Sequence, residues 1–220
     1  MKTDYSPIDY LNWNLNGKGE NIFPFLTPIE KTIWDKAISF QDKREDIGHA
    51  EIVTYFALKL LEYFSADREI LIPSAILHDT GYNVSPKFFR EASSLGKDRE
   101  MRLEHQVRGS LIAYEILKKI NCQSQKIVEI IRIILNHDTR ISNQNELELG
   151  VSLEETLMRE ADVLWRFTGP CIAQYHQNKT IQESLELLKK QQNNLYLDIS
   201  KKISIIETEN TFSNNFKNEN

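Results

Sequence analysis

Apolar residues recur three and four positions apart along most of the chain, which is the spacing of amphipathic helices. Between residues 124 and 137, for example, Ile127, Ile130 and Ile134 share one face of a helix with His137. The pattern leaves almost no segment with the alternation that is typical of a strand. We therefore predict an all-α fold. Its expected helices cover residues 28–40, 46–64, 68–79, 100–120, 124–137, 152–167 and 182–205.

Four segments interrupt the helical pattern and set the expected boundaries. Residues 1–27 contain prolines, glycines and asparagines, and we expect them to form an irregular arm. Residues 86–98 form a polar insertion, and residues 141–150 form a loop. Residues 207–220 are polar enough to be disordered. The remaining span, 28–206, is then one helical domain that is long enough to bury a sizeable core.

Composition narrows the classes of partner. The 220 residues include 27 Lys and Arg against 32 Asp and Glu, a formal net charge of -5, which argues against duplex nucleic acid or an anionic membrane. The richest apolar run, "IVEIIRIIL", is interrupted by two charges and is too short to span a bilayer. Cys122 and Cys171 follow no spacing pattern, and the N-terminus lacks the pattern of a signal peptide. We therefore expect reduced thiols in a cytoplasmic protein.

Polar groups occupy positions that the helical pattern turns inward. The third predicted helix is apolar through Leu77, then ends in His78-Asp79, and Gly81 is expected to stop it. An inward polar group without a partner is costly, and a metal ion is an economical partner for imidazole and carboxylate. Five successive helices each contribute one such residue or pair: His49, His78-Asp79, His105, His137 and Asp162.

This arrangement predicts a site for Zn, Mn, Fe or Ni. Taken singly, each of these residues has a blander interpretation. A lone histidine on an apolar face is commonly a hydrogen-bonded core residue, and Asp162 can be half of an ion pair with Arg159 or Arg166.

The residue order His49, His78-Asp79 and Asp162 resembles the HD-domain superfamily of metal-dependent phosphohydrolases. The surrounding segments "GHAEIVTYFALKLL", "ILHDTGY" and "READVLWRF" are similar to it as well, over about residues 33–167. The resemblance implies that these four side chains bind one divalent ion.

Two further segments, "EHQVRGSLIAYEIL" and "IILNHDTR", resemble the members that hold a second ion. In those members His105 and His137 would be ligands and Asp79 would bridge the ions, with Asp138 as a weaker candidate. The expected cofactors are thus two divalent transition metal ions, iron or manganese first and zinc or nickel as alternatives.

The resemblance implies hydrolysis of a small phosphorylated substrate, a phosphomonoester or a nucleotide, by a metal-bound hydroxide. Asp79 and Arg108 are the expected catalytic residues, since Arg108 lies three residues after His105 on a helix. Further candidates are the cations Arg44, Lys87 and Arg166 for the phosphate, and the carboxylates Asp138 and Glu104 for a proton.

Other functions remain open on the same scaffold. Some relatives with the doubled histidine set use a mixed-valent di-iron centre to oxidise C–H or C–P bonds with O₂, and others hydrate small nitriles. A regulatory or binding module with a structural metal site is the third interpretation. The sequence lacks the Gly-Tyr-Pro motif of cyclic-di-GMP phosphodiesterases, which argues against that substrate.

Overall fold

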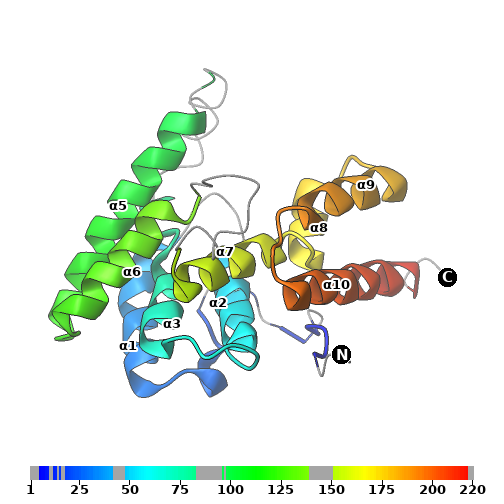
Figure 1. Cartoon of the computed structure of the whole chain (residues 1–220). Coiled ribbons are helices and arrows are strands. Elements are labelled where there is room, and N and C mark those ends of the chain that lie inside the picture. Colours follow the sequence, from blue (N-terminus) through cyan, green and yellow to red (C-terminus); the bar gives the residue numbers. More distant parts are fainter. Residues whose placement is uncertain are drawn as a thin grey trace.

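Helices form the regular structure of the protein, as the cartoon of the computed structural model shows (Figure 1). The structure describes residues 5–9, 12–13, 15, 18–41, 48–82, 96, 98–138 and 151–217. No strand occurs within these ranges, which confirms the predicted all-α class. The α-helices are α1 Pro28–Ala37, α2 His49–Leu60, α3 Arg68–Leu77, α5 Asp98–Lys119, α6 Ser124–Asn136, α7 Leu153–Trp165, α8 Gly169–Tyr175, α9 Ile181–Gln192 and α10 Asp198–Lys217.

Side-chain caps start four of these helices. Each capping residue accepts a hydrogen bond from a backbone N–H of the first turn, which otherwise has no partner in the helix. Thr27 before α1 and Thr180 before α9 form full capping boxes with the glutamates three residues on. Asp67 and Ser152 cap α3 and α7 in the simpler way.

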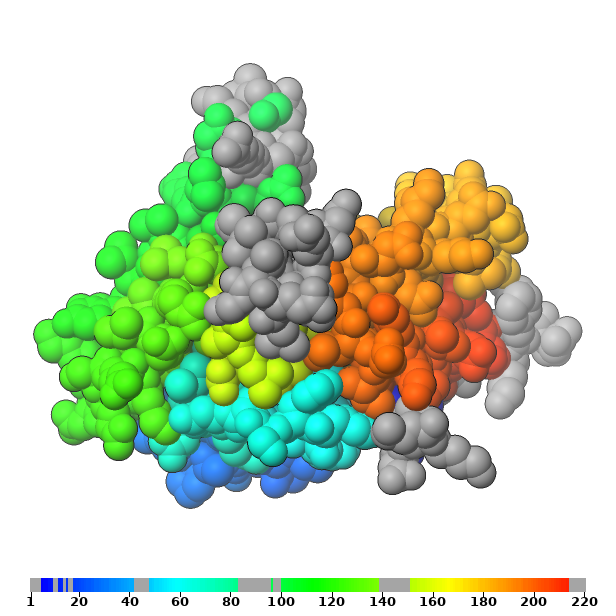
Figure 2. All heavy atoms as spheres, viewed as in Figure 1, coloured from blue at the N-terminus to red at the C-terminus, as the bar shows by residue number. Residues whose placement is uncertain are grey.

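The centre of the fold consists of α2, α3 and α7, which bury most of their circumference. Every residue of α3 from Leu71 to Leu77 is buried, and so are nearly all residues of α7 from Glu155 to Trp165. A helix that is apolar on most sides lies inside a domain. In the view of Figure 2, α5 and α6 (green) form one flank and α9 and α10 (orange to red) form the other.

The chain leaves α3 differently from our expectation. The helix ends at Leu77, and a 3-10 turn follows at Thr80–Tyr82. Gly81 does not adopt a left-handed conformation, so it does not stop the helix as a C-cap glycine would. A Cβ at Gly81 would lie 1.8 Å from the carbonyl oxygen of His105 and 2.7 Å from the amide nitrogen of Gly109. The glycine is required because the backbone of α5 approaches the turn this closely.

The C-terminal third also differs from the sequence prediction. The single helix expected over 182–205 is two helices, α9 and α10, and α8 was not expected. The break is held by the buried carboxylate of Glu160 on α7. It accepts hydrogen bonds from the backbone N–H groups of Tyr196 at 2.8 Å and Leu197 at 3.4 Å, just before α10 begins.

Residues 207–217 form part of a helix where we expect disorder. From residue 207 onward the sequence predicts a disordered tail, but α10 continues through Lys217. Glu207 is buried because it accepts hydrogen bonds from the Tyr5 hydroxyl and, at 3.0 Å, from the backbone N–H of Ile8. Asn210 donates to the Ile8 carbonyl at 3.2 Å. The N-terminal arm therefore packs along α10.

Several sequence predictions concern residues outside the described ranges. These are the first residues of the helix expected from 46, most of the insertion at 86–98, and the loop at 141–150. Among the described helices, none combines the length and hydropathy that crossing a membrane requires.

Candidate metal centre

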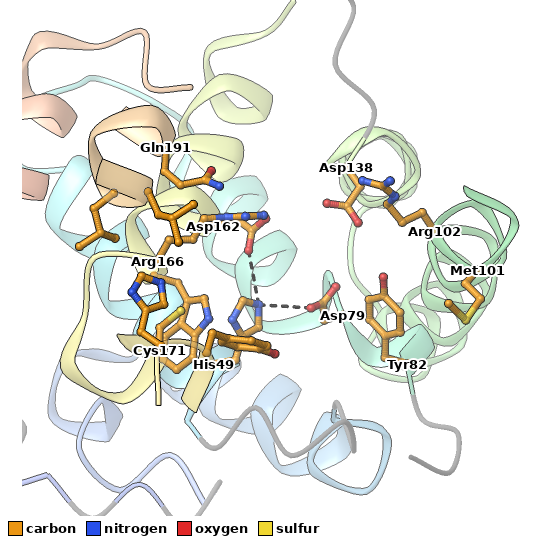
Figure 3. A pocket seen from close by; sticks show the side chains of 15 residues that line it. His49, Asp79, Tyr82, Met101, Arg102, Asp138, Asp162, Arg166, Cys171 and Gln191 are labelled. Carbon is orange, nitrogen blue, oxygen red and sulfur yellow. Dashed lines mark ion pairs between the residues drawn. The ribbon is translucent and has the colours of Figure 1, made fainter. Parts of the chain in front are cut away.

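The first cluster brings together four side chains from α2, α3 and α7. His49 is the first residue of α2, His78 and Asp79 directly follow α3, and Asp162 lies on α7. The His49 Nε2 atom lies 3.0 Å from His78 Nε2, 3.2 Å from Asp79 Oδ2 and 3.4 Å from Asp162 Oδ1. Figure 3 draws the two contacts from His49 to the carboxylates. Sequence positions more than 100 residues apart thus converge on one point in the core.

The second cluster joins α5 and α6 to the same aspartate. The Nε2 atoms of His105, on α5, and His137, directly after α6, lie 3.2 Å apart. Asp79 Oδ1 lies 3.3 Å from His137 Nε2 and 3.6 Å from His105 Nε2. Asp138 Oδ2 lies 3.4 Å from His105 Nε2. Asp79 therefore turns one oxygen toward each cluster.

Backbone carbonyls fix the tautomers of three histidines. The Nδ1 atoms of His78, His105 and His137 lie 2.8, 3.3 and 2.7 Å from the carbonyl oxygens of Ala75, Met101 and Ile134. A carbonyl only accepts hydrogen bonds, so each Nδ1 carries the proton and donates it.

In a neutral ring this tautomer leaves a lone pair on Nε2. When both rings are neutral, lone pairs face each other across the 3.2 Å between His105 and His137. A cation between them removes this repulsion, and Nδ1–H donation to a carbonyl is the usual support of a metal-binding histidine. The residues therefore fit a divalent metal ion.

The electrostatics of the second cluster favour a positive charge. Burial lowers the pKa of His105 to about 4, and burial lowers the pKa of His78 as well. Burial also acts to lower the pKa of His137, but the hydrogen bond with Asp79 and the charge of Asp138 outweigh it and raise this pKa to about 9. The carboxylates thus stabilise a cation at the point where the histidines meet.

Two aromatic rings hold the histidines in place. The ring of Tyr82 stacks on His105 with centroids 3.7 Å apart and planes inclined by 14°. The indole of Trp165 meets the His49 ring edge-on at 5.2 Å. Because ring orientation decides where a lone pair points, these contacts help to set the geometry of both clusters.

A cavity of about 570 Å³ opens onto the two clusters. His49, Asp79, Asp138 and Asp162 reach it from the clusters, as Figure 3 shows. Two described arginines, Arg102 and Arg166, also line it. Arg166 was a candidate from the sequence, whereas Arg102 was missed although it lies one helical turn before His105.

The structure does not bring Arg108 to this cavity. Its guanidinium lies 3.7 Å from Glu104 Oε1, and neither side chain is among the described residues that line the cavity. His105 and Gly109 lie on the side of α5 that faces the turn after α3. Arg108 points about 80° away from that side around the helix axis. The sequence candidates Arg44 and Lys87 fall outside the described residues.

A buried arginine supports the end of α6. Arg159 on α7 donates to the carbonyl of Asn136, the residue before His137, at 2.9 Å, and to Glu155 at 2.8 Å. Glu155 is buried and also accepts from Arg132 at 2.7 Å. Arg159 was one expected ion-pair partner of Asp162. Its hydrogen bond to Asn136 ties α6 to α7 beside the second cluster.

The comparisons with known proteins agree with this geometry. The family model described as the HD domain matches residues 46–166. Searches of curated proteins and of solved structures each found no significant match. The matched range contains every histidine and aspartate of the two clusters and spans more than half of the 220 residues. The chain therefore belongs to the HD-domain family.

Proposed function

We propose that the protein is a metal-dependent hydrolase of a small phosphorylated substrate, a phosphomonoester or a nucleotide. The observation that carries this proposal is the pair of buried His/Asp clusters joined through Asp79 at one cavity. Membership of a superfamily of metal-dependent phosphohydrolases supports it. In addition, Arg102 and Arg166 line the same cavity, where a phosphate needs positive charge.

Two divalent ions are assigned in this proposal. His49, His78, Asp79 and Asp162 hold the first, and Asp79, His105 and His137 hold the second with support from Asp138. Within each of two groups, the ligand atoms lie within 4.8 Å of one another. The groups are His49, His78 and Asp79, and Asp79, His105 and His137. A set of imidazoles and carboxylates suits Fe, Mn, Zn or Ni.

The chemistry divides between the ions and the chain. A divalent ion held by these ligands would lower the pKa of a bound water to about 7 and would polarise a phosphoryl oxygen. The guanidinium groups of Arg102 and Arg166 bind the outer oxygens of the phosphate and orient it. Asp138 lines the cavity and is the carboxylate that exchanges a proton with the reacting groups. Arg108 has no part in this assignment, since it lies beside Glu104.

One experiment tests the activity. Metal-loaded protein is assayed with phosphomonoesters, and Asp79→Ala is compared with Asp35→Ala, an exposed aspartate on α1. We expect Asp79→Ala to lower turnover by a hundredfold or more, because loss even of an outer-shell partner costs about 10–100-fold. Asp35→Ala is expected to match the wild type. Turnover that survives in Asp79→Ala at the wild-type rate would refute the proposed site.

The identity of the active metal and the uptake of O₂ separate hydrolysis from the alternative oxidation chemistry. Two clusters that share one carboxylate also suit a di-iron centre that uses O₂, which is why this alternative remains. Activity with manganese and without O₂ consumption supports the hydrolase. An absolute need for iron, with O₂ uptake and no phosphate release, supports the oxygenase.

Metal counting tests the second ion. If wild type, His105→Ala and His137→Ala all bind the same single ion, the assignment of a second ion is wrong.

A further inference from the structure

The cavity extends well beyond the residues that match the HD domain. Its lining includes side chains from α8, from the residue after it, and from α9, all outside the matched range 46–166. They are Cys171, Tyr175, His176, Leu187, Leu188 and Gln191. The C-terminal helices therefore supply a wall of the cavity that faces the metal centre.

The two sides of the cavity differ in chemistry. Figure 3 shows Arg102, Met101 and Tyr82 on one side of Asp79, and Cys171, Arg166 and Gln191 on the other. The second side is completed by Trp165, Tyr175, Leu187 and Leu188, which are aromatic or aliphatic. Burial and the charge of Lys179 lower the pKa of His176, so this imidazole is neutral at pH 7. Apart from Arg166 and the cluster residue Asp162, the described residues on this side carry no charge at neutral pH.

The cavity has room for a ligand larger than phosphate. A volume of about 570 Å³ is in the usual range of sites for small organic molecules, roughly 300–1,000 Å³. The charged groups near the two clusters occupy only one part of it. The remaining part offers the exposed ring of Tyr175 at its rim and the buried side chains of Leu188 and Cys171 inside.

We propose that α8 and α9 form a subsite for the organic part of the substrate, and that this part is an uncharged group with an aromatic ring. The inference rests on the proposed function in placing the phosphate at the metal centre. The Tyr175 ring, which is 51% exposed, packs against the ligand ring, and Leu187 and Leu188 remove its faces from water. The Gln191 amide pairs with a polar edge of the ring. A hydroxyl-rich organic group finds few partners among these side chains.

The test compares ligands that differ only in the organic part. Benzylphosphonate and methylphosphonate are not hydrolysed, so calorimetry on the metal-loaded protein in the absence of O₂ measures their binding without turnover. Benzyl phosphate and glycerol 1-phosphate, both esters of primary alcohols, provide the matching comparison of kcat/KM. We expect the wild type to prefer the benzyl compound of each pair by about tenfold, the effect of burying one aromatic ring in part.

Variants locate the preference on α8 and α9. Tyr175→Ala and Leu187→Ala are expected to lower the benzyl preference about tenfold and several-fold, respectively. The matched controls are Tyr114→Ala, an exposed tyrosine on α5, and Leu185→Ala, an exposed leucine on α9. Neither is among the described residues that line the cavity, and both should keep the wild-type preference. Because Tyr175 is half exposed, its removal leaves the fold intact, which circular dichroism verifies.

Each outcome bears on the subsite. Equal binding of the two phosphonates, no binding of benzylphosphonate, or an unchanged preference in both variants would overturn it. If no phosphomonoester is hydrolysed but the benzyl preference in binding is present and falls in Tyr175→Ala, the subsite stands and the proposed function fails. If both esters are hydrolysed without any benzyl preference, the proposed function stands and the subsite fails.

Discussion

The two clusters use the same side-chain types but are supported in different ways. The first is built on α2, α3 and α7, the central helices, whose packed faces are apolar and fully buried. The second depends on α5 and α6 at the flank of the fold, where Leu103, Val107 and Leu111 of α5 are exposed. Besides Asp79, the backbone contact between Gly81 and α5 connects it to the first cluster. Core packing therefore positions the first cluster and the α6 side of the second, while a close backbone approach positions α5.

The largest effect should follow from breaking that approach. Gly81→Ala places a Cβ 1.8 Å from the His105 carbonyl, so α5 must move away from the turn. We expect a loss of at least about 3 kcal/mol in the free energy of unfolding, the upper end for overpacking, measured by chemical denaturation. The second cluster should lose its ion while the first retains one.

Gly109→Ala provides a graded control for this change. Its Cβ would lie 3.2 Å from the His78 carbonyl, so a displacement of a few tenths of an ångström relieves the contact. The loss of stability should be clearly smaller than in Gly81→Ala. Equal losses would mean that the close approach at Gly81 is not what joins α5 to the turn.

The next largest effect is expected from metal removal, which should distinguish the two clusters. An ion present at a hundred times its dissociation constant stabilises the folded state by about 2.7 kcal/mol, and chelation removes this contribution. We expect titration with a chelator to proceed in two steps, with the second cluster emptied first, because its helices are more peripheral. Metal analysis along the titration, combined with melting temperatures, gives the measurement. Loss of both ions in a single step would contradict the proposed difference between the clusters. Loss of the ion from the first cluster before the second would contradict it as well. Comparison of Asp162→Ala with His105→Ala identifies which cluster loses its ion.

A smaller effect is expected from Arg159→Met. The change removes the hydrogen bond to Asn136 beside His137 and one of two arginines on the buried Glu155. Hydrogen bonds of charged groups contribute about 1.5–3 kcal/mol, so we expect a loss of about 2 kcal/mol and weaker binding of the second ion. Arg132→Met is the control, since Arg132 pairs with Glu155 from the surface. Equal ion binding in the two variants would show that Arg159 does not position His137.

The smallest change sharpens the role of Tyr82. Tyr82→Leu removes the ring stacked on His105, while Tyr82→Phe keeps it. Such ring contacts contribute about 0.5–1.5 kcal/mol, so Tyr82→Leu should weaken the second ion by up to about tenfold and Tyr82→Phe far less. Calorimetric titration of the second ion measures both variants. If the two variants weaken it equally, the hydroxyl matters rather than the stack.

The sequence was most informative where a polar residue interrupts an apolar helix face. His137 and Asp162 were identified in this way, and the structure brings them to the two clusters with His49, His78, Asp79 and His105. This inference works because burial of an imidazole or a carboxylate requires a partner, and helical spacing reveals which positions are buried.

Features set by contacts between distant segments were not predictable from spacing. The break between α9 and α10 depends on Glu160 from another helix, and local propensity carries no sign of it. Arg108 was expected at the site because of its spacing from His105, but it is not among the described residues that line the cavity. The side of α5 that meets the turn at Gly81 carries His105 and Gly109. The cavity wall from α8 and α9 likewise needs the three-dimensional structure.

The hydrogen bonds from Tyr5 and Ile8 to Glu207 have a consequence for synthesis of the chain. About 200 residues separate these partners, so the arm is translated long before α10 exists. At about 5–20 residues per second, the interval is roughly 10–40 s on the ribosome. During this time Ile8 and Tyr5, both buried in the finished protein, have no α10 against which to pack. Docking of the arm is therefore a late step of folding, and chaperones that bind apolar nascent segments have this interval in which to act.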